Sequence, residues 1–441
     1  MSRIYLVTLG CDKNRVDGET MLGMLAGEGF QIVDAPEIAD AIVVNTCGFI
    51  MDAVKESVEL IFDLHQVKLA HGCKALVVVG CMAERFMDEL KVELPEADVI
   101  LGVGANEQLV KILRILTGHQ SAPTGDAQPF PRLAARASAE KPHIAYVKIA
   151  EGCDTNCTYC TIPFIRGPYR SRPMEEISDE CKSLVALGAK ELVLVAQDTA
   201  LYGMDLYGKR MLPELLRELS TCGAKWLRLM YVYPEHITVK LISTIAELDN
   251  VCKYIDMPLQ HCEGRILRAM GRGGGRYELE RLIGALRESI PGLSLRTTLM
   301  VGFPGETDED FDSLCDFVKA QRFERMGVFQ YSQEEGTPAS LMSPQADEKV
   351  KRSRYRRVMR LQQKIHFEKQ KALVGQVIEV IVDDFLPDES LYVGRPYFDA
   401  PETDGAVYFT SEENLGIGDF CHVVVTKASG YDLEGRRHES P

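Results

Sequence analysis

The chain has 441 residues, of which 46% are hydrophobic and 26% charged, and it carries a formal net charge of -15. This length predicts two or three folded domains, the composition excludes a disordered chain, and the acidity argues against a general nucleic-acid binder. Because the longest apolar runs are strand-sized, far below the roughly 20 residues of a membrane helix, we expect a soluble, cytoplasmic protein without membrane contact.

Residues 1–118 repeat one unit three times: an apolar strand, a cysteine and a helix-like segment. The strands and the cysteines that follow them are 4–10 with Cys11, 41–46 with Cys47, and 75–80 with Cys81. This alternation predicts a parallel α/β domain, in which the carboxyl ends of all strands lie along one edge. We therefore expect the three cysteines to converge there, although any one of them could instead be a small buried apolar residue.

Residues 119–141, rich in Pro, Ala and Ser, predict a linker between domains. The domain that follows spans 142–371 and contains six apolar strands, at 144–150, 191–197, 226–233, 254–260, 295–303 and 326–332. Six strands separated by helix-length stretches predict a partial (β/α)6 barrel, with its chemistry at the carboxyl ends of the strands. The basic stretch 350–371 could suggest RNA binding, but its helical apolar spacing equally predicts a trailing linker helix with a solvated charged face.

Residues 372–441 predict a small closed β-barrel with short strands at 377–384, 390–396, 406–410 and 421–426. From Leu373 onward this segment has fourteen acidic and four basic residues, a formal net charge of -10. RNA binding is not expected of it, because Lys and Arg contacts supply most of the affinity for phosphate. Such a domain should attract a basic protein, unless its acidity serves solubility alone.

Three further cysteines, Cys153, Cys157 and Cys160, follow the first strand of the predicted barrel. The number of cysteines in the chain, thirteen, is odd and favours reduced thiols over a disulfide framework. A structural zinc site usually takes two close pairs of ligands, and a redox dithiol would leave Cys153 without a role. Three thiolates at C-x3-C-x2-C spacing suit a four-iron cluster with one iron open to another ligand.

This motif, with the aromatic Tyr159 before its last cysteine, resembles that of the radical S-adenosylmethionine superfamily. The resemblance implies that the open iron binds S-adenosylmethionine and that residues near later strand ends contact the rest of the cofactor. The candidate cofactor-binding residues are Tyr159, Gln197, Asp198 and Arg296. Asp and Arg at such places are as often ordinary ion-pair residues.

The N-terminal domain with its own three cysteines resembles that of the methylthiotransferases, a family of radical enzymes that end in a small β-barrel called the TRAM domain. The resemblance covers essentially the whole chain. Segments 9–19, 45–50 and 399–408 are similar to the RimO branch, which modifies an aspartate of ribosomal protein S-twelve, whereas another branch modifies an adenosine of transfer RNA. Asp12 and Gly18 depart from the pattern, where proline and serine are common.

The resemblance implies an enzyme with two 4Fe–4S clusters, which converts a C–H bond at the aspartate β-carbon into C–SCH3. Cys11, Cys47 and Cys81 would hold the cluster that delivers the methylthio group, and Cys153, Cys157 and Cys160 the cluster that cleaves S-adenosylmethionine to a radical. An electron donor such as flavodoxin or ferredoxin is implied, and no catalytic acid or base. Two alternatives stay open: a transfer-RNA adenosine methylthiotransferase and a non-catalytic iron–sulfur scaffold or sensor.

Overall fold

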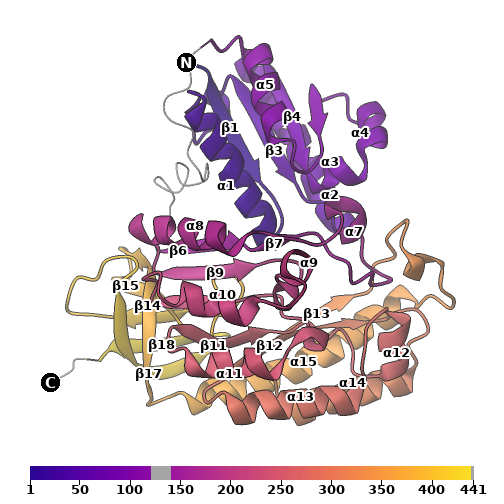
Figure 1. The fold of residues 1–441 in the computed structure, drawn as a ribbon, viewed down its shortest axis with the longest axis vertical. Helices are drawn as coiled ribbons and strands as arrows, with labels where there is room; N and C mark the ends of the chain where they lie inside the picture. Colours follow the sequence, from indigo (N-terminus) through magenta and orange to yellow (C-terminus); the bar gives the residue numbers. More distant parts are fainter. Residues whose placement is uncertain (121–140, 439–441) are drawn as a thin grey trace.

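The chain folds into three parts that follow one another in sequence (Figure 1). The computed structural model describes residues 1–120 and 141–438, so most of the predicted linker, 119–141, lies outside the described residues. Within the described part of the chain, no helix is both long enough and apolar enough to span a bilayer.

The N-terminal part is a five-stranded parallel sheet with strand order β2-β1-β3-β4-β5. The predicted parallel α/β domain and its three strands, β1, β3 and β4, are confirmed, and the short strands β2 and β5 were missed. Its elements are β1 (Arg3–Thr8), α1 (Asp12–Gly27), β2 (Gln31–Ile32), β3 (Ala41–Thr46), α2 (Met51–His71), β4 (Ala75–Gly80), α3 (Cys81–Arg85), α4 (Met87–Glu93), β5 (Val99–Leu101) and α5 (Asn106–Thr117). Separate apolar clusters fill the two faces of the sheet, so β3 and β4 are buried throughout. This burial explains why both strands read as continuous apolar runs.

The central part is a six-stranded parallel sheet that curves into a partial barrel, with strand order β13-β12-β11-β10-β9-β6. Its strands are β6 (Ile144–Lys148), β9 (Glu191–Val195), β10 (Trp226–Leu229), β11 (Val251–Asp256), β12 (Ser294–Val301) and β13 (Arg325–Gln330). The helices on its outer face include α8 (Met174–Ala186), α10 (Leu212–Leu219), α11 (Val239–Glu247), α13 (Arg276–Ser289) and α14 (Asp308–Gln321). All six predicted strands are therefore confirmed, in consecutive order.

Two additions complete the central part. A hairpin of β7 (Ala150–Glu151) and β8 (Arg170–Ser171) encloses the cysteine loop, which runs into the short helix α7 (Ile162–Arg166). The predicted trailing helix is α15 (Glu348–Ala372), which packs beside β13 and α14. Its apolar residues at helical spacing, such as Val358 and Ile365, join the main core.

The C-terminal part is a closed barrel with strand order β14-β15-β16-β18-β17. Its strands are β14 (Val377–Leu386), β15 (Leu391–Pro396), β16 (Val407–Thr410), β17 (Phe420–Ser429) and β18 (Asp432–Arg437). The four predicted strands are confirmed, but β18 was missed. Its sequence, DLEGRR, has one apolar residue, Leu433, and therefore lacks the alternation by which strands are recognised.

The C-terminal barrel packs into the concave face of the central sheet. An apolar cluster there combines Tyr146, Trp226 and Tyr254 of the sheet with Ile381 and Ala400 of the barrel. Beside it, Glu191 accepts hydrogen bonds from Arg228 at 2.6 Å and from Arg395 of the barrel at 2.6 Å. The Glu191 and Arg228 side chains are fully buried, and the two guanidinium groups outweigh the effect of that burial and lower the pKa of the Glu191 carboxyl.

We predict that Glu191→Gln lowers the free energy of unfolding by about 3 kcal/mol. The substitution leaves the buried guanidinium of Arg228 without its carboxylate partner and leaves Arg395 with Asp383 alone. Chemical denaturation of the full chain measures the change. Glu379→Gln is the matched control, since Glu379 pairs with Lys225 at the surface of the same junction and should change stability by less than about 1 kcal/mol. Equal effects of the two substitutions would contradict the assigned role of Glu191.

Candidate functional site

The structure brings the three N-terminal cysteines together at the carboxyl edge of their sheet. Cys11 precedes α1, Cys47 follows β3, and Cys81 follows β4 directly. Gly10 has a φ of +90° and lies so close to Cys47 that a Cβ at position 10 would come within 2.8 Å of the Cβ of Cys47. Burial raises the pKa of the Cys81 thiol to about 11, and the neighbouring thiols of Cys11 and Cys47 add to the increase. The convergence expected from the strand-cysteine repeat is present.

The three barrel cysteines lie in the loop that connects β7 to α7. Cys153 and Cys157 are buried and Cys160 is half-buried. Burial raises the pKa of the Cys160 thiol to about 12, and Cys157 and Cys153 contribute to it as close neighbours. The three thiols therefore face one another within a single short loop.

The segment 269–275, which includes a glycine-rich turn, supports this loop. Thr158 donates from its backbone nitrogen to the carbonyl of Met270 at 3.0 Å, and from its hydroxyl to the carbonyl of Ala269 at 2.8 Å. Gly271 has a φ of +73°, and a Cβ there would lie 3.0 Å from the carbonyl oxygen of Asn156. Only glycine combines this backbone conformation with so close an approach.

Arg272, next to this glycine, is a cation behind the cysteine loop that the sequence analysis missed. Its guanidinium makes two hydrogen bonds to Glu235, at 2.8 and 3.0 Å, and its centre lies 4.3 Å from the ring centroid of Tyr233. Burial raises the pKa of the Cys157 thiol, and the positive charge of Arg272 opposes that increase. The side chain therefore favours the thiolate that a metal would need.

A second buried cation, Arg166 at the end of α7, connects the segment after the barrel cysteines to the N-terminal cysteine set. One of its terminal nitrogens, Nη2, donates to the Sγ atom of Cys81 at 3.1 Å and to Asn14 at 3.3 Å. The other, Nη1, donates to Asp17 at 2.6 Å and to Glu151 at 3.0 Å. Its side chain is 2% exposed, so these partners take the place of water.

Lys148 completes this group of charges by binding both Asp17 and Glu151. Burial alone would raise the pKa of Glu151, but Lys148 and Arg166 outweigh it and hold the pKa at about 2. Two carboxylates and two cations therefore pair at the contact between the N-terminal domain and the cysteine loop. Motif reading missed Lys148, Glu151 and Arg166 because ordinary charged residues carry no spacing signal.

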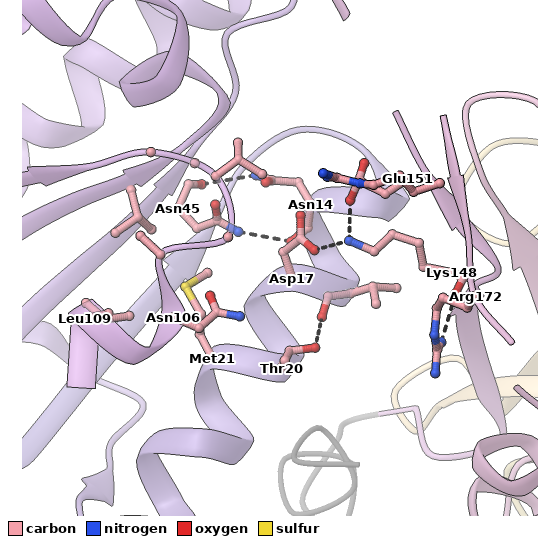
Figure 2. Close-up of a pocket in the computed structure, with 18 of the residues that line it drawn as sticks. Asn14, Asp17, Thr20, Met21, Asn45, Asn106, Leu109, Lys148, Glu151 and Arg172 are labelled. Atoms are coloured by element: carbon pink, nitrogen blue, oxygen red, sulfur yellow. Dashed lines mark hydrogen bonds and ion pairs between the residues drawn. The ribbon is translucent and has the colours of Figure 1, made fainter. Parts of the chain in front are cut away.

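A cleft of about 350 Å³, lined by both polar and apolar side chains, borders these charges (Figure 2). Figure 2 shows Lys148 between Asp17 and Glu151, with Asn45 and Asn14 beside them and Arg172 farther along the cleft. The walls come from α1 and the start of α5 on one side, and from the β7–β8 hairpin and α8 on the other. The two domains therefore meet through polar groups here.

Of the four predicted cofactor residues, Tyr159 and Gln197 lie beside the cysteine loop. The Tyr159 ring packs edge-on against Phe303, with centroids 6.5 Å apart, and burial raises the pKa of its hydroxyl. Gln197 donates to Glu151 at 2.9 Å. Among the described residues its Oε1 atom finds no hydrogen-bond partner although it is buried, which leaves an acceptor for a ligand.

The other two, Asp198 and Arg296, are engaged within the protein. The fully buried Asp198 caps a short 3-10 turn by accepting from the backbone nitrogen of Ala200 at 3.0 Å, and it also binds His236. Arg296 is the third residue of β12, so the expectation that it follows a strand is wrong. It pairs with Asp256 at 2.8 Å and faces the C-terminal barrel. Their roles as cofactor contacts stay predictions.

The donor chemistry fits iron–sulfur clusters better than a single metal ion. Across residues 1–120 and 141–438, no three His, Cys, Asp or Glu side chains are close enough to share one ion. Each thiolate on a four-iron cube binds a different iron, so its ligands lie farther apart than those of one ion. Two converging sets of three cysteines, each beside a buried cation that favours thiolate, meet this requirement.

Three family models match successive parts of the chain. Residues 3–102 match the uncharacterized protein family UPF0004, residues 147–318 the radical SAM superfamily, and residues 374–437 the TRAM domain. Among solved structures, the radical S-adenosylmethionine methyltransferase TsrM from Kitasatospora setae, with cobalamin and a 4Fe–4S cluster bound, is 16% identical, covers 77% of both chains and has a TM-score of 0.56. That likeness shows the fold.

Curated relatives match over nearly the full length. The ribosomal protein uS12 methylthiotransferase RimO of Desulforamulus reducens is 47% identical over 445 residues, which is 99% of both chains. The RimO of Lachnoclostridium phytofermentans is 43% identical over 436 residues, 98% of this chain and 99% of its own.

The chain belongs to the RimO family. This membership confirms a radical S-adenosylmethionine methylthiotransferase that acts on ribosomal protein uS12 and uses two 4Fe–4S clusters. It decides against the transfer-RNA branch and against a non-catalytic scaffold, the two alternatives that the sequence left open.

Proposed function

We propose that each set of three cysteines in this RimO-family enzyme holds one cluster. Cys11, Cys47 and Cys81 bind the N-terminal cluster, and Cys153, Cys157 and Cys160 bind the cluster at which S-adenosylmethionine is cleaved. The observation that carries this assignment is the hydrogen bond from Arg166, which ends the helix after the barrel cysteine loop, to the Sγ of Cys81 in the N-terminal set. This contact supports a short path between a sulfur-delivering centre at the N-terminal cysteines and a radical-forming centre in the barrel loop, which methylthiolation requires.

When bound, the clusters and S-adenosylmethionine supply the methylthio group and the radical that removes a hydrogen from the aspartate β-carbon. The protein positions these groups and excludes water from them. Thr158 and Gly271 fix the barrel loop, and Arg272 and Arg166 place positive charge beside the thiolates of Cys157 and Cys81. Because these cations are buried and already paired with carboxylates, they are oriented before any cofactor binds.

The contacts with S-adenosylmethionine form a second part of the proposal. Gln197 is the best supported, because its buried Oε1 accepts from no described residue and its amide is held by Glu151, two residues before Cys153. The aromatic ring of Tyr159 provides a flat surface next to Cys160. Asp198 and Arg296 act through the residues they position, His236 and Asp256. An amide and an aromatic ring suit the polar and flat parts of such a cofactor.

The division of the chain is proposed as residues 1–118 for the N-terminal domain, 142–371 for the radical domain and 372–441 for the TRAM domain, with 119–141 between the first two. The ends of α5 at Thr117 and of α15 at Ala372 support these limits. We further propose a cytoplasmic enzyme that receives its electron from a donor such as flavodoxin or ferredoxin, since ribosomal protein uS12 is its substrate.

The acidic TRAM domain is the proposed docking surface for uS12. Asp384, Asp388, Glu389 and Glu412 are exposed there, whereas Asp383 binds Arg395 and His143 and is needed inside the molecule. Negative charge attracts a basic protein partner and repels nucleic acid, so RNA binding by this domain is not expected.

Two triple variants test the cluster assignment, and each serves as the control for the other. We predict that Cys153→Ala with Cys157→Ala and Cys160→Ala keeps half of the iron after anaerobic reconstitution, about four of about eight atoms, and loses cleavage of S-adenosylmethionine. Cys11→Ala with Cys47→Ala and Cys81→Ala should also keep half of the iron, but should retain cleavage and lose only methylthiolation. Iron analysis and assays for 5'-deoxyadenosine and modified uS12 separate the two. A variant that lost all of its iron, or none, would refute independent clusters.

The contact between Arg166 and Cys81 gives a test that leaves every cysteine in place. Hydrogen bonds and positive charge at a ligand sulfur raise a cluster's reduction potential, so we predict that Arg166→Gln lowers that of the N-terminal cluster. A redox titration followed by electron paramagnetic resonance, in the background without barrel cysteines, isolates this cluster. The matched control is Arg172→Gln, which removes a cation that pairs with Glu176 and Glu180 in the same region. An equal shift in both variants would contradict the assignment.

Neutralising the exposed acids of the TRAM domain should weaken binding of uS12. We predict that Asp384→Asn, Asp388→Asn, Glu389→Gln and Glu412→Gln together raise the Kd of the full chain for uS12 and flatten its dependence on salt. Binding is measured by fluorescence anisotropy of labelled uS12 at several salt concentrations. The control variant carries Glu278→Gln, Glu288→Gln and Glu309→Gln, three exposed acids of the central domain. If the control weakened binding as much, the docking surface would lie elsewhere.

A further inference from the structure

The outer face of α15 carries a dense row of cations. Along its 25 residues, the exposed basic side chains are Lys349, Arg352, Arg356, Arg357, Arg360, Lys364 and Lys371. Residues 349, 352, 356, 360 and 364 recur every three or four positions, so they lie along one side of the helix. At 1.5 Å per residue this row, called the α15 row below, is about 22 Å long.

The basic residues on the two faces of α15 differ in whether they form ion pairs. Facing inward, Arg354 binds Glu306 and Asp308, and Lys351 binds Glu348. Facing outward, Lys349, Arg356 and Arg360 form no ion pair with any residue that the structure describes. The chain has 65 acidic and 50 basic residues, so it contains more than enough acidic residues to pair with the cations of this face. The unpaired cations indicate a partner outside the chain.

The α15 row begins at the edge of the barrel where the chemistry takes place. Gly302, directly after β12, packs against Lys351 in the first turn of α15: a Cβ at Gly302 would lie 2.4 Å from the Cγ of Lys351. The Lys351 ammonium also lies 5.2 Å from the ring of Tyr331, and Tyr331 contacts Phe303, which in turn contacts Tyr159 of the cysteine loop. The first turn of α15, which holds Lys349 of the row as well as the inward-facing Lys351, therefore lies at this edge, so a polyanion bound along the row would reach the edge of the barrel.

We infer that the α15 row binds the phosphate backbone of ribosomal RNA, so that uS12 is modified while it is attached to RNA. The inference rests on the proposed function and deepens it. RNA fits because a line of Lys and Arg neutralises successive phosphates, and because the substrate is itself a ribosomal protein. A membrane surface fits less well, since a membrane-bound helix must turn an apolar face outward and the apolar face of α15 is buried against the main core.

The α15 row and the TRAM domain carry opposite charges, so they would bind different components of the substrate. The TRAM domain carries acids that repel phosphate, whereas α15 presents its cations on the domain next to it. An acidic surface for the protein component and a basic one for the RNA component would orient a complex of the two. Free uS12 could use only the first of these surfaces.

The test compares two substrates and two variants of the full-length reconstituted enzyme. The row variant carries Arg352→Gln, Arg356→Gln, Arg360→Gln and Lys364→Gln. The control variant removes as many exposed cations elsewhere, through Lys91→Gln, Lys111→Gln, Lys209→Gln and Arg281→Gln. The substrates are isolated uS12 and small ribosomal subunits whose uS12 is unmodified, and binding is measured separately with protein-free small-subunit RNA.

We expect the row variant to lose about tenfold in activity on the subunits while its activity on isolated uS12 stays within twofold of the unaltered enzyme. Its affinity for the RNA should fall, and the slope of log affinity against log salt should shrink by about 3, or about 0.7 to 0.9 for each of the four lost phosphate contacts. The control variant should behave like the unaltered enzyme in all three measurements.

The outcomes separate the two proposals. If the unaltered enzyme modifies isolated uS12 but the row variant matches it on subunits and RNA, the α15 inference is wrong and the proposed function stands. If the row variant loses activity equally on both substrates, the row does not act through RNA and the inference is also wrong. If the unaltered enzyme modifies neither substrate, the proposed function itself fails.

Discussion

Buried charges need partners of opposite charge, and this requirement holds the N-terminal domain against the cysteine loop of the central domain. Arg166 and Lys148 of the central domain and Asp17 of the N-terminal domain are withdrawn from water at the same point, with Glu151 between them. Breaking such a group by moving one domain away would leave charges without partners, at a cost of several kcal/mol. The position of Cys81 relative to the barrel loop depends on this group, because its sulfur accepts from the same guanidinium.

The fold was predictable wherever the chain repeats a simple pattern. Continuous apolar runs such as 75–80 and 192–195 are buried on both faces of parallel sheets, so the sequence predicted β4 and β9 correctly. The strand β18 was missed, since its pairing is supplied by neighbours in a closed barrel rather than by its own apolar residues. The docking of that barrel into the central sheet was not predictable either, because Glu191 and Arg395 are 204 positions apart.

The residues of the candidate site also fall into two groups, those that sequence patterns predicted and those that they did not. Cysteine spacing is a local property that sequence displays, and both sets of cysteines were found from it. Cations that support them from other elements, such as Arg166 and Arg272, depend on tertiary contacts and carry no motif. Arg296 was expected in a loop after a strand, but it lies inside β12 and donates a hydrogen bond to Asp256, so only its expected position was wrong. Residue type alone could not distinguish these cases.

The junction between the central sheet and the C-terminal barrel limits how the enzyme can be dissected. A chain shortened to end before β14 would lack Arg395, leaving Glu191 with one of its two cations, and would uncover Trp226 and Tyr254 on the concave face. Exposed aromatic surface of this kind promotes aggregation. Loss of activity after such a truncation would report misfolding and say nothing about substrate recruitment. Conversely, the small barrel expressed alone would expose Ile381 and the guanidinium of Arg395, so surface substitutions in the intact chain are the informative route.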